Sequence, residues 1–255
     1  MFELSDVRVG YDGRRVLDID RLTLAGDAVT VILGHNGSGK STLMSLLARQ
    51  RRPDGGTVAL HGRPLGAYSQ RALARAVAFL PQRLPDVPGL DVRELCGLGR
   101  FPWRGALGRW RAADDAAVAA ALARTHMTAF AGRIVDHLSG GERQRAWIAM
   151  LLAQEAPILM LDEPISALDL AHQVEVLSLL RDLNRASGCG VITILHDINL
   201  AAHYADRIVA LKGGRIAFDG SPEELMQEPV LSGLYGLDIA LVDHPTRTAR
   251  VAVIA

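Results

Sequence analysis

Lysine is nearly absent from this 255-residue sequence, in which only Lys40 and Lys212 occur and all other basic residues are arginine. One of the two lysines lies inside a glycine-rich segment, which suggests a requirement that arginine does not meet. An excess of charge is also missing, because 28 basic residues balance 28 acidic ones. The net charge of zero therefore gives no overall attraction for nucleic acid or for an anionic membrane surface.

Cysteine is scarce as well, and Cys96 and Cys189 lie far apart without a CxxC spacing. We therefore expect buried free thiols in a reducing cytosol rather than a disulfide framework or a metal site. The most apolar stretch, Met150 to Leu161, is interrupted by polar residues and a proline, and is shorter than the roughly 18–20 residues that span a bilayer. An acidic residue close to the N-terminus and the lack of a long apolar run predict no signal peptide.

Apolar residues make up 49% of the chain, enough for a sizeable core. Phe2 to Val9 alternates like a half-exposed strand, and Leu17 to Leu24 fits an antiparallel neighbour. Val29 to Leu33 is a β-branched run typical of a strand buried on both faces, and a helix from about Gly39 to Arg49 follows it. Further buried strands are expected at Val77–Leu80, Ile158–Leu161 and Val191–Leu195. The pattern predicts an α/β fold with a mostly parallel sheet and an antiparallel N-terminal β part.

A change of pattern begins near residue 86. From Val92 to Leu152 the signals are helical, with strong helix formers in Asp114–Arg124. We interpret residues 86–154 as a helical subdomain inserted into an α/β core of residues 1–85 and 155–226, all within a single domain of residues 1–255. A short helix capped by Ser221 is expected near the end of the core, and residues 227–255 form a tail without an interpretable pattern.

The segment from Gly34 to Ser41 fits the phosphate-binding loop G-x-x-x-x-G-K-[ST] between a buried strand and a helix. Its glycines let backbone N–H groups converge on phosphate oxygens at a helix N-terminus. Lys40 would reach the β- and γ-phosphates, and Ser41 would offer its hydroxyl to Mg²⁺. The alternative is a glycine-rich turn without a ligand. The expected nucleotide-binding residues of this loop are Gly34, Asn36, Gly37, Ser38, Gly39, Lys40, Ser41 and Thr42.

Polar residues follow three of the other predicted strands. Asp162 and Glu163 end an apolar strand, where unpaired acids would be costly unless they serve a metal ion or a reaction. Asp162 could hold Mg²⁺, and Glu163 could polarise an attacking water. Gln82 and His196 also follow predicted strands, and ligands gather at the carboxyl ends of strands in such sheets. Gln82 could sense Mg²⁺ or the water, and His196 could hydrogen-bond the γ-phosphate; each alone could equally be a solvated strand end. His172 and His203 are interpreted as surface or packing residues.

A second glycine-rich segment, LSGGERQ, starts another helix at Leu138. Ser139 and Glu142 have the spacing of a capping box. The box does not account for Gly140 and Gly141, each of which costs roughly 0.5–1 kcal/mol relative to Ala inside a helix. Bare glycines at a helix N-terminus permit close approach by a phosphate. We therefore expect a second anion site here, for a γ-phosphate that another molecule holds.

LSGGERQ resembles the signature sequence of ATP-binding cassette (ABC) ATPases, and the resemblance extends over about residues 2 to 226. In that family two subunits dock head to tail, and each signature loop, here Ser139 to Glu142, completes the ATP site of the opposite subunit. The resemblance implies that Tyr11 stacks on adenine and that residues 166–169 form the D-loop. It also implies that Glu163 is the catalytic base, that His196 is the switch histidine, and that Gln82, with Ser41 and Asp162, contacts Mg²⁺. Ile165 stands where threonine is common.

Segments such as GRFPW at Gly99 and DLAHQ at Asp169 further resemble the ATPases of ferric siderophore importers, with ferric hydroxamate importers as the nearest group. Haem and vitamin B12 importers share much of this pattern and remain alternatives. The implied partners are a second copy of the chain, a membrane permease and, indirectly, a substrate-binding protein, with ATP and Mg²⁺ at the site. The implied location is peripheral, on the cytoplasmic face of the cell membrane. A soluble ABC protein acting on DNA or ribosomes, a P-loop kinase or GTPase, a non-catalytic nucleotide-binding regulator and an exporter subunit are the rival interpretations.

Overall fold

The computed structural model describes residues 1–11, 13–105, 108–166, 168–243 and 250–255. The chain divides into two compact units, of which the first comprises residues 1–65 and 192–255 and the second residues 66–191. Strand β8 (Gly190–Ile194) contains the second boundary. These units differ from the sequence-based subdivision into core, helical subdomain and tail, which stays a prediction.

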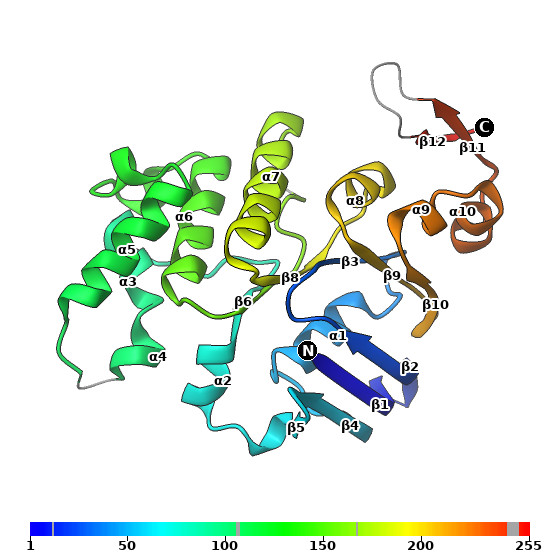
Figure 1. Cartoon of the computed structure of the whole chain (residues 1–255), viewed down its shortest axis with the longest axis horizontal. Helices are drawn as coiled ribbons and strands as arrows, with labels where there is room; N and C mark the ends of the chain where they lie inside the picture. The colour runs from blue at the N-terminus through cyan, green and yellow to red at the C-terminus, as the bar shows by residue number, and fades with distance from the viewer. Residues whose placement is uncertain (12, 106–107, 167, 244–249) are drawn as a thin grey trace. The chain divides into compact units, whose positions relative to one another are not determined.

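The first unit contains two sheets and a hairpin (Figure 1). An antiparallel sheet has the order β2-β1-β4-β5, and β1 pairs with β2 from Phe2↔Leu24 to Tyr11↔Arg14. In the other sheet the order within this unit is β10-β9-β3-β8, with β3 and β9 parallel. The elements are β1 (Phe2–Tyr11), β2 (Arg14–Leu24), β3 (Val29–Gly34), α1 (Lys40–Leu47), β4 (Gly55–Leu60), β5 (Arg63–Pro64), α8 (Ile198–Tyr204), β9 (Arg207–Lys212), β10 (Arg215–Gly220), α9 (Pro222–Leu225), α10 (Glu228–Tyr235), β11 (Ile239–Asp243) and β12 (Arg250–Ile254).

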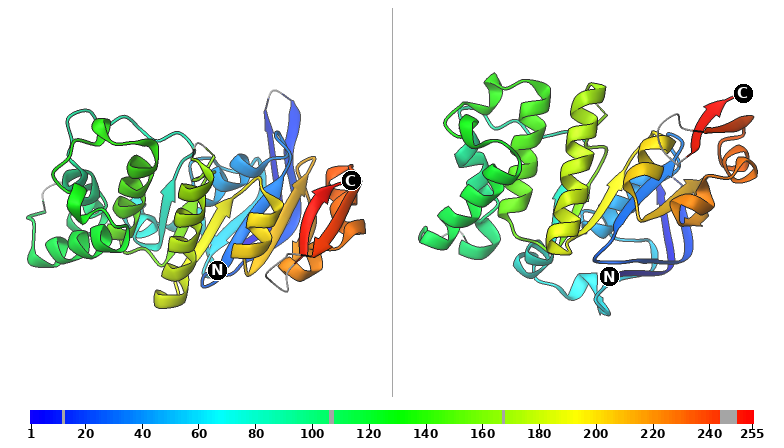
Figure 2. Two further views of the ribbon diagram at one scale, coloured as in Figure 1. Left: turned by 90° about the horizontal axis from the view of Figure 1, so that it is seen from above. Right: turned by 45° about the horizontal axis from the view of Figure 1, so that its top comes forward.

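The second unit pairs β6 in parallel with β7 and adds a group of helices (Figure 2). Helices α3, α5 and α6 pack against one another through buried side chains that include Leu95, Val118 and Ile148. The elements are α2 (Gln70–Ala76), β6 (Val77–Leu80), α3 (Val92–Leu98), α4 (Phe101–Arg104), α5 (Ala112–Arg124), α6 (Gly140–Ala153), β7 (Ile158–Leu161) and α7 (Leu170–Ser187), with the short 3₁₀ helices η1 (Leu65–Ala67), η2 (Thr128–Phe130) and η3 (Val135–His137).

The strands predicted from apolar runs are all present, and the helical interpretation of 92–152 holds for its described residues apart from one isolated bridge between Asp91 and Ile134. Strands β4, β9, β10, β11 and β12 have no counterpart in the sequence-based prediction. The first thiol, Cys96, is buried as expected, but Cys189 is partly exposed. The predicted cap at Ser221 is confirmed, since its hydroxyl accepts from the backbone N–H of Glu224.

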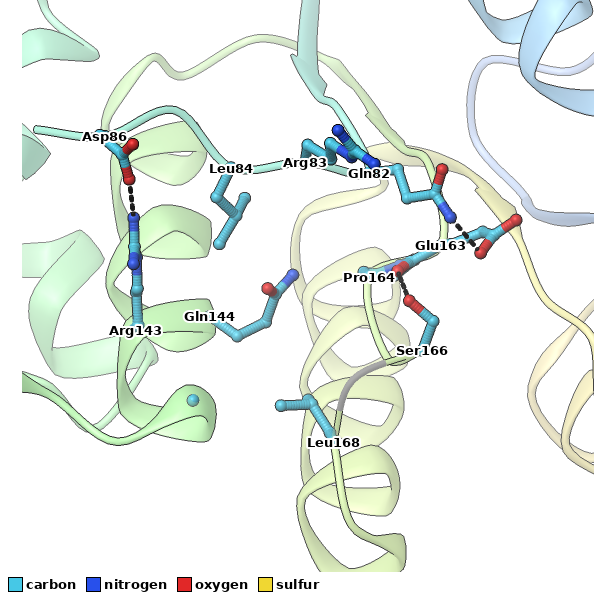
Figure 3. A pocket seen from close by; sticks show the side chains of 11 residues that line it. Gln82, Arg83, Leu84, Asp86, Arg143, Gln144, Glu163, Pro164, Ser166 and Leu168 are labelled. Carbon is cyan, nitrogen blue, oxygen red and sulfur yellow. Dashed lines mark hydrogen bonds and ion pairs between the residues drawn. The ribbon is translucent and has the colours of Figure 1, made fainter.

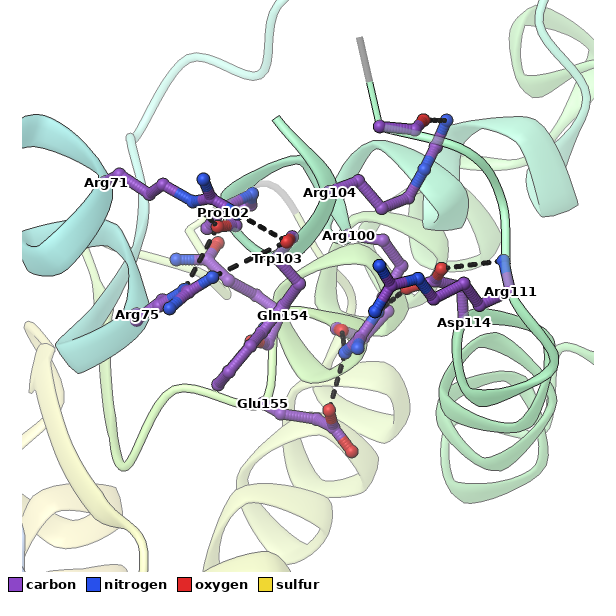
Figure 4. A network of polar contacts seen from close by, with 12 residues as sticks. Arg71, Arg75, Arg100, Pro102, Trp103, Arg104, Arg111, Asp114, Gln154 and Glu155 are labelled. Carbon is purple, nitrogen blue, oxygen red and sulfur yellow. Dashed lines mark hydrogen bonds and ion pairs between the residues drawn. The ribbon is translucent and has the colours of Figure 1, made fainter. Parts of the chain in front are cut away.

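A buried ion pair links the start of α4 to α5 (Figure 4). Arg100 Nε donates to Asp114 Oδ1 at 2.9 Å, and both side chains are less than 10% exposed. The same guanidinium donates to Glu155 and to the carbonyl of Ala153. Burial raises the pKa of Asp114, but the bonds from Arg100 and from the backbone of Arg111 outweigh it and hold the pKa below its ordinary value.

We expect Asp114→Ala to lower the free energy of unfolding by about 1.5–3 kcal/mol, because the buried Arg100 loses its buried carboxylate partner and keeps only Glu155 and the carbonyl of Ala153. The matched control is the exposed pair between α3 and α5, Arg93 and Asp115, which are 2.7 Å apart; Asp115→Ala should cost less than about 1 kcal/mol. Urea unfolding measures both, and equal losses for the two variants would contradict this account.

Because the folded-state pKa of Asp114 is depressed, the stabilisation that its carboxylate provides is complete above pH 3.8 and is lost as the pH falls through the folded-state pKa.

Candidate functional site

The predicted phosphate loop forms the turn between β3 and α1 in the first unit. Gly34 has φ +143°, and a Cβ there would lie 2.3 Å from the carbonyl oxygen of Leu211 on the neighbouring strand. Gly39 has φ +104° and would place a Cβ 2.6 Å from Leu17 Cδ2. Both positions combine a left-handed backbone with close packing, so only glycine fits them without displacement of a strand.

Lys40 is 5% exposed, and its ammonium lies inside the loop. Its Nζ donates to the carbonyl oxygens of Gly34 at 2.7 Å and His35 at 3.0 Å. The Ser38 hydroxyl is buried and has no hydrogen-bond partner among the described residues. A buried hydroxyl of this kind and an enclosed amine at the start of a helix fit a phosphate ligand.

An open cavity of about 430 Å³ adjoins the loop and is lined by Gly34, His35, Asn36, His196 and Tyr235. The structure therefore brings the predicted switch histidine to the same cavity as three residues of the phosphate loop. Tyr235 was not predicted. Its ring makes an edge contact with the His35 ring, with the centroids 5.3 Å apart.

Tyr11, expected from the resemblance to stack on adenine, is 46% exposed at the end of β1. The Arg51 guanidinium lies 3.9 Å from the centroid of its ring and also donates to the carbonyl of Gly10. Arginine therefore holds the orientation of the Tyr11 ring on a solvent-exposed surface.

In the second unit, β7 ends at the predicted acids, and Gln82 follows the neighbouring strand β6. Gln82 Nε2 donates to Glu163 Oε2 at 2.7 Å (Figure 3). Asp162 is buried, and its N–H donates to the carbonyl of Leu80. Glu163 has φ +51°, an unfavourable conformation for a residue with a side chain, and its carbonyl accepts from the Ser166 hydroxyl at 3.2 Å. Gln82 and Glu163, two of the residues predicted for the site, are therefore in direct contact.

The signature-like segment starts α6 as the capping box predicts. The backbone N–H of Glu142 donates to Ser139 Oγ at 3.4 Å, and the Glu142 carboxylate accepts from the N–H of Ser139 at 2.8 Å. These bonds hold the pKa of Glu142 below its ordinary value, the backbone bond being the larger effect.

The two glycines of this segment have different surroundings. A Cβ on Gly140 would meet nothing within 4 Å, which agrees with space for an approaching ligand. A Cβ on Gly141 would lie 2.7 Å from the His172 ring. His172 Nδ1 is 2.7 Å from Asp169 Oδ1, so the ring is held in place. Packing against the His172 ring therefore accounts for Gly141, and phosphate approach at the two glycines stays a prediction.

The loop between β7 and α7 carries the expected D-loop, of which Ala167 lies outside the described residues. Asp169 caps α7 by accepting from the N–H of His172. A cleft of about 390 Å³ runs along this loop, and Gln82, Asp86, Gly140, Arg143, Glu163 and Ser166 are among its lining residues (Figure 3). It brings together the two predicted catalytic side chains of this unit and the first signature glycine.

Within the described ranges no group of three or more His, Cys, Asp or Glu side chains could hold a metal ion. Mg²⁺ in phosphate-transfer sites typically takes one or two protein oxygens and completes its shell with phosphate and water. Ser41 has a hydroxyl, Gln82 an amide and Asp162 a carboxylate, and each of these oxygens is a hard donor of the kind that Mg²⁺ prefers.

Comparison with known proteins decides the family. The family described as ABC transporter matches residues 17–166. The chain belongs to the ABC transporter family. Its members are ATPases, and this chain is an ATP-binding, ATP-hydrolysing subunit of that family.

Relatives cover nearly the whole chain. The achromobactin transport ATP-binding protein of Dickeya dadantii is 44% identical over 241 residues, 94% of this chain and 89% of that protein. The hemin import ATP-binding protein of Streptomyces coelicolor is 45% identical over 97% of this chain and 87% of its own length. The iron(3+)-hydroxamate import ATP-binding protein of Bacillus subtilis is 38% identical, with coverages of 96% and 91%. This ABC ATPase thus groups with subunits of siderophore and haem import systems.

Among solved structures, a dimeric post-hydrolysis state of an ATP-binding cassette bound to ADP and Pi superimposes with a TM-score of 0.76. It is 27% identical, and the match covers 87% of this chain and 99% of that one. The match confirms the predicted fold class, an α/β P-loop ABC ATPase with an antiparallel β part and helices. A search of the helices in the described part of the chain finds none with the length and apolarity needed to span a membrane.

We expect Gly141→Ala to lower the melting temperature of the ABC ATPase, because overpacking against the His172 ring typically costs 1–3 kcal/mol. Gly140→Ala is the matched control and should leave the melting temperature unchanged or raise it, since its Cβ enters open space and alanine favours the helix. Adding His172→Ala to Gly141→Ala should recover part of the loss. Thermal unfolding of the four proteins measures this, and equal melting temperatures for the two glycine variants would refute it.

Proposed function

We propose that this ABC ATPase hydrolyses ATP as a head-to-tail homodimer and thereby powers import of a ferric siderophore through a separate membrane permease. The observation that carries the proposal is the complete set of nucleotide-site residues in a chain whose relatives are named for siderophore and hemin import.

The phosphate loop and its neighbours bind the nucleotide. Gly34 and Asn36 to Thr42 surround the phosphates, with Lys40 turning from its loop carbonyls to the β- and γ-phosphate oxygens, and Tyr11 stacks on adenine. His196 hydrogen-bonds the γ-phosphate. Support comes from the cavity that His196 shares with the loop and from the enclosed Lys40 ammonium.

Glu163 is the general base that takes a proton from the attacking water. Its contact with Gln82 supports this role, because the amide fixes the orientation of the carboxylate. Mg²⁺ bound by Ser41, Gln82 and Asp162 would neutralise charge on the phosphate oxygens. The chain's own contribution is to align the carboxylate and to bind the phosphates.

The signature segment, Ser139 to Glu142, acts on the ATP held by the partner subunit. Its support is the capped helix start, the open space at Gly140 and the dimeric arrangement of the similar cassette. Binding across two subunits makes closure depend on ATP, because only the closed dimer gains both sets of contacts.

The permease would receive this motion through the helical subdomain and the segment around residues 82–104, and the subunit would lie peripherally on the cytoplasmic face of the membrane. A hydroxamate-type ferric siderophore is the cargo proposed from the sequence, delivered by a substrate-binding protein. The relatives span several siderophores and hemin, so haem import is the second candidate.

We expect Glu163→Gln to reduce kcat for ATP hydrolysis by 100-fold or more, since general-base catalysis supplies about 10²–10⁴ in rate, while ATP still binds. Phosphate release and calorimetric ATP titration separate the two effects. Lys40→Ala is the control that should lose nucleotide binding. Hydrolysis by Glu163→Gln at the wild-type rate would show that another group is the base.

A second expectation concerns the shared site. Ser139→Trp should abolish turnover of the homodimer but leave the ATP affinity of each isolated subunit unchanged. Mixing it with Lys40→Ala subunits should restore activity to part of the population, because one site then combines an intact phosphate loop with an intact signature segment. Mixtures that remain inactive, or a Ser139→Trp homodimer with full activity, would contradict composite sites.

The cargo is tested by reconstituting the subunit with its permease in vesicles and comparing the uptake of ferric hydroxamates with the uptake of haem.

A further inference from the structure

The C-terminal segment, residues 227–255, has no role in the function proposed above. Its described part is α10 followed by the antiparallel pair β11 and β12. Leu231 on α10 is fully buried and Leu234 nearly so, so the helix is packed into the first unit rather than attached loosely. Figure 1 shows α10 beside β11 in this unit.

Hydrogen bonds tie the segment together and to the sheet. Lys212 Nζ, on β9, donates to the carbonyl of Gly233 at 2.7 Å. Gly233 lies in the last turn of α10, where the helix dipole also stabilises a cation. The N–H of Leu241 on β11 donates to the Glu228 carboxylate at the start of α10. The segment is therefore fixed at both ends of its helix.

Two side-chain contacts reach from the segment to nucleotide-site elements. The first is the edge contact of Tyr235 with the ring of His35, the residue after Gly34 in the phosphate loop. Both residues line the cavity that contains Asn36 and His196.

The second contact is made by Asn199, on the helix that begins two residues after His196. Its Oδ1 accepts from the N–H of Ala252 at 2.8 Å, and its Nδ2 donates to the carbonyl of Ala252 at 3.1 Å. One asparagine thus satisfies both backbone groups of a residue on β12. A bidentate contact of this kind fixes α8 to the C-terminal hairpin.

We propose that the C-terminal segment positions the nucleotide site, with Tyr235 holding the phosphate loop through His35 and Ala252 holding the His196 loop through Asn199. The inference rests on the nucleotide site proposed above. Tyr235 and Asn199 are positioning residues, and the two contacts act on different steps: the first on ATP binding and the second on hydrolysis.

Burial, with a smaller contribution from Asp197, raises the pKa of Tyr235 to about 12, so the phenol stays neutral at physiological pH. A neutral ring packs beside the anionic phosphates of a nucleotide without charge repulsion.

The first test is a double-mutant cycle on the full-length protein. Tyr235→Ala should raise the KM for ATP roughly 2- to 12-fold with kcat within twofold, the range expected from loss of one aromatic contact. His35→Ala should have a similar effect, and the double variant should be no worse than the stronger single variant. Tyr235→Phe keeps the ring and should retain the wild-type KM. Additive single effects, or a Phe variant as impaired as Ala, would overturn the role of the ring contact.

The second test separates the two contacts. Asn199→Ala should lower kcat roughly 2- to 10-fold and leave KM within twofold, because its hydrogen bonds act on the helix after His196. His203→Ala, which removes an edge contact between the rings of His203 and Tyr204 on the same helix, is the matched control and should leave both kcat and KM within twofold. If folded Tyr235→Ala and Asn199→Ala proteins keep the wild-type KM and kcat and only their melting temperature is lowered, the segment stabilises the fold without positioning the nucleotide site, and the proposal is wrong. Lys40→Ala keeping its ATP affinity would instead refute the nucleotide site itself.

Discussion

The backbone of the turn between β3 and α1 is the constraint on which the site depends. A left-handed glycine at each end lets the chain leave a buried strand, enclose a lysine amine and enter a helix within a few residues. The same glycines touch neighbouring strands so closely that no side chain fits, so the phosphate loop is positioned by the sheet beside it. Its N–H groups are therefore oriented by the fold before any ligand arrives, which lowers the entropic cost of binding.

A comparable arrangement holds the carboxylate of Glu163, the proposed base. Glu163 occupies a backbone conformation that costs free energy for a non-glycine residue, and the Ser166 hydroxyl and the Gln82 amide contact its carbonyl and its carboxylate. Such strain persists only where the surroundings over-determine it. The orientation of the Glu163 carboxylate is thus maintained by residues that follow two strand ends rather than by the conformational preference of Glu163 itself.

The features of the fold and the site that depend only on neighbouring residues could be predicted from the sequence. Val29–Leu33 is apolar apart from Thr30 because the strand is buried on both faces, and the cap at Ser139 needs only its own helix. Features that depend on distant residues could not be predicted in this way. Gly141 is required by a histidine 31 positions later, and Tyr235 meets the phosphate loop across 200 residues. Strand β10 could not be predicted because its residues alternate only between exposed and partly exposed and its partner is set by tertiary pairing. Strand β9 contains the buried apolar run Ile208–Leu211, so the rule applied to the other buried strands could have found it.

The scarcity of lysine has a practical consequence for the chemistry of the surface. Lys40 is enclosed in the phosphate loop, whereas Lys212 is solvent-exposed next to α10. An acylating reagent directed at side-chain amines therefore finds a single accessible lysine among the described residues. A fluorophore attached to Lys212 would lie between β9 and α10. It would report rearrangements at this one place, because the arginines do not react with the reagent.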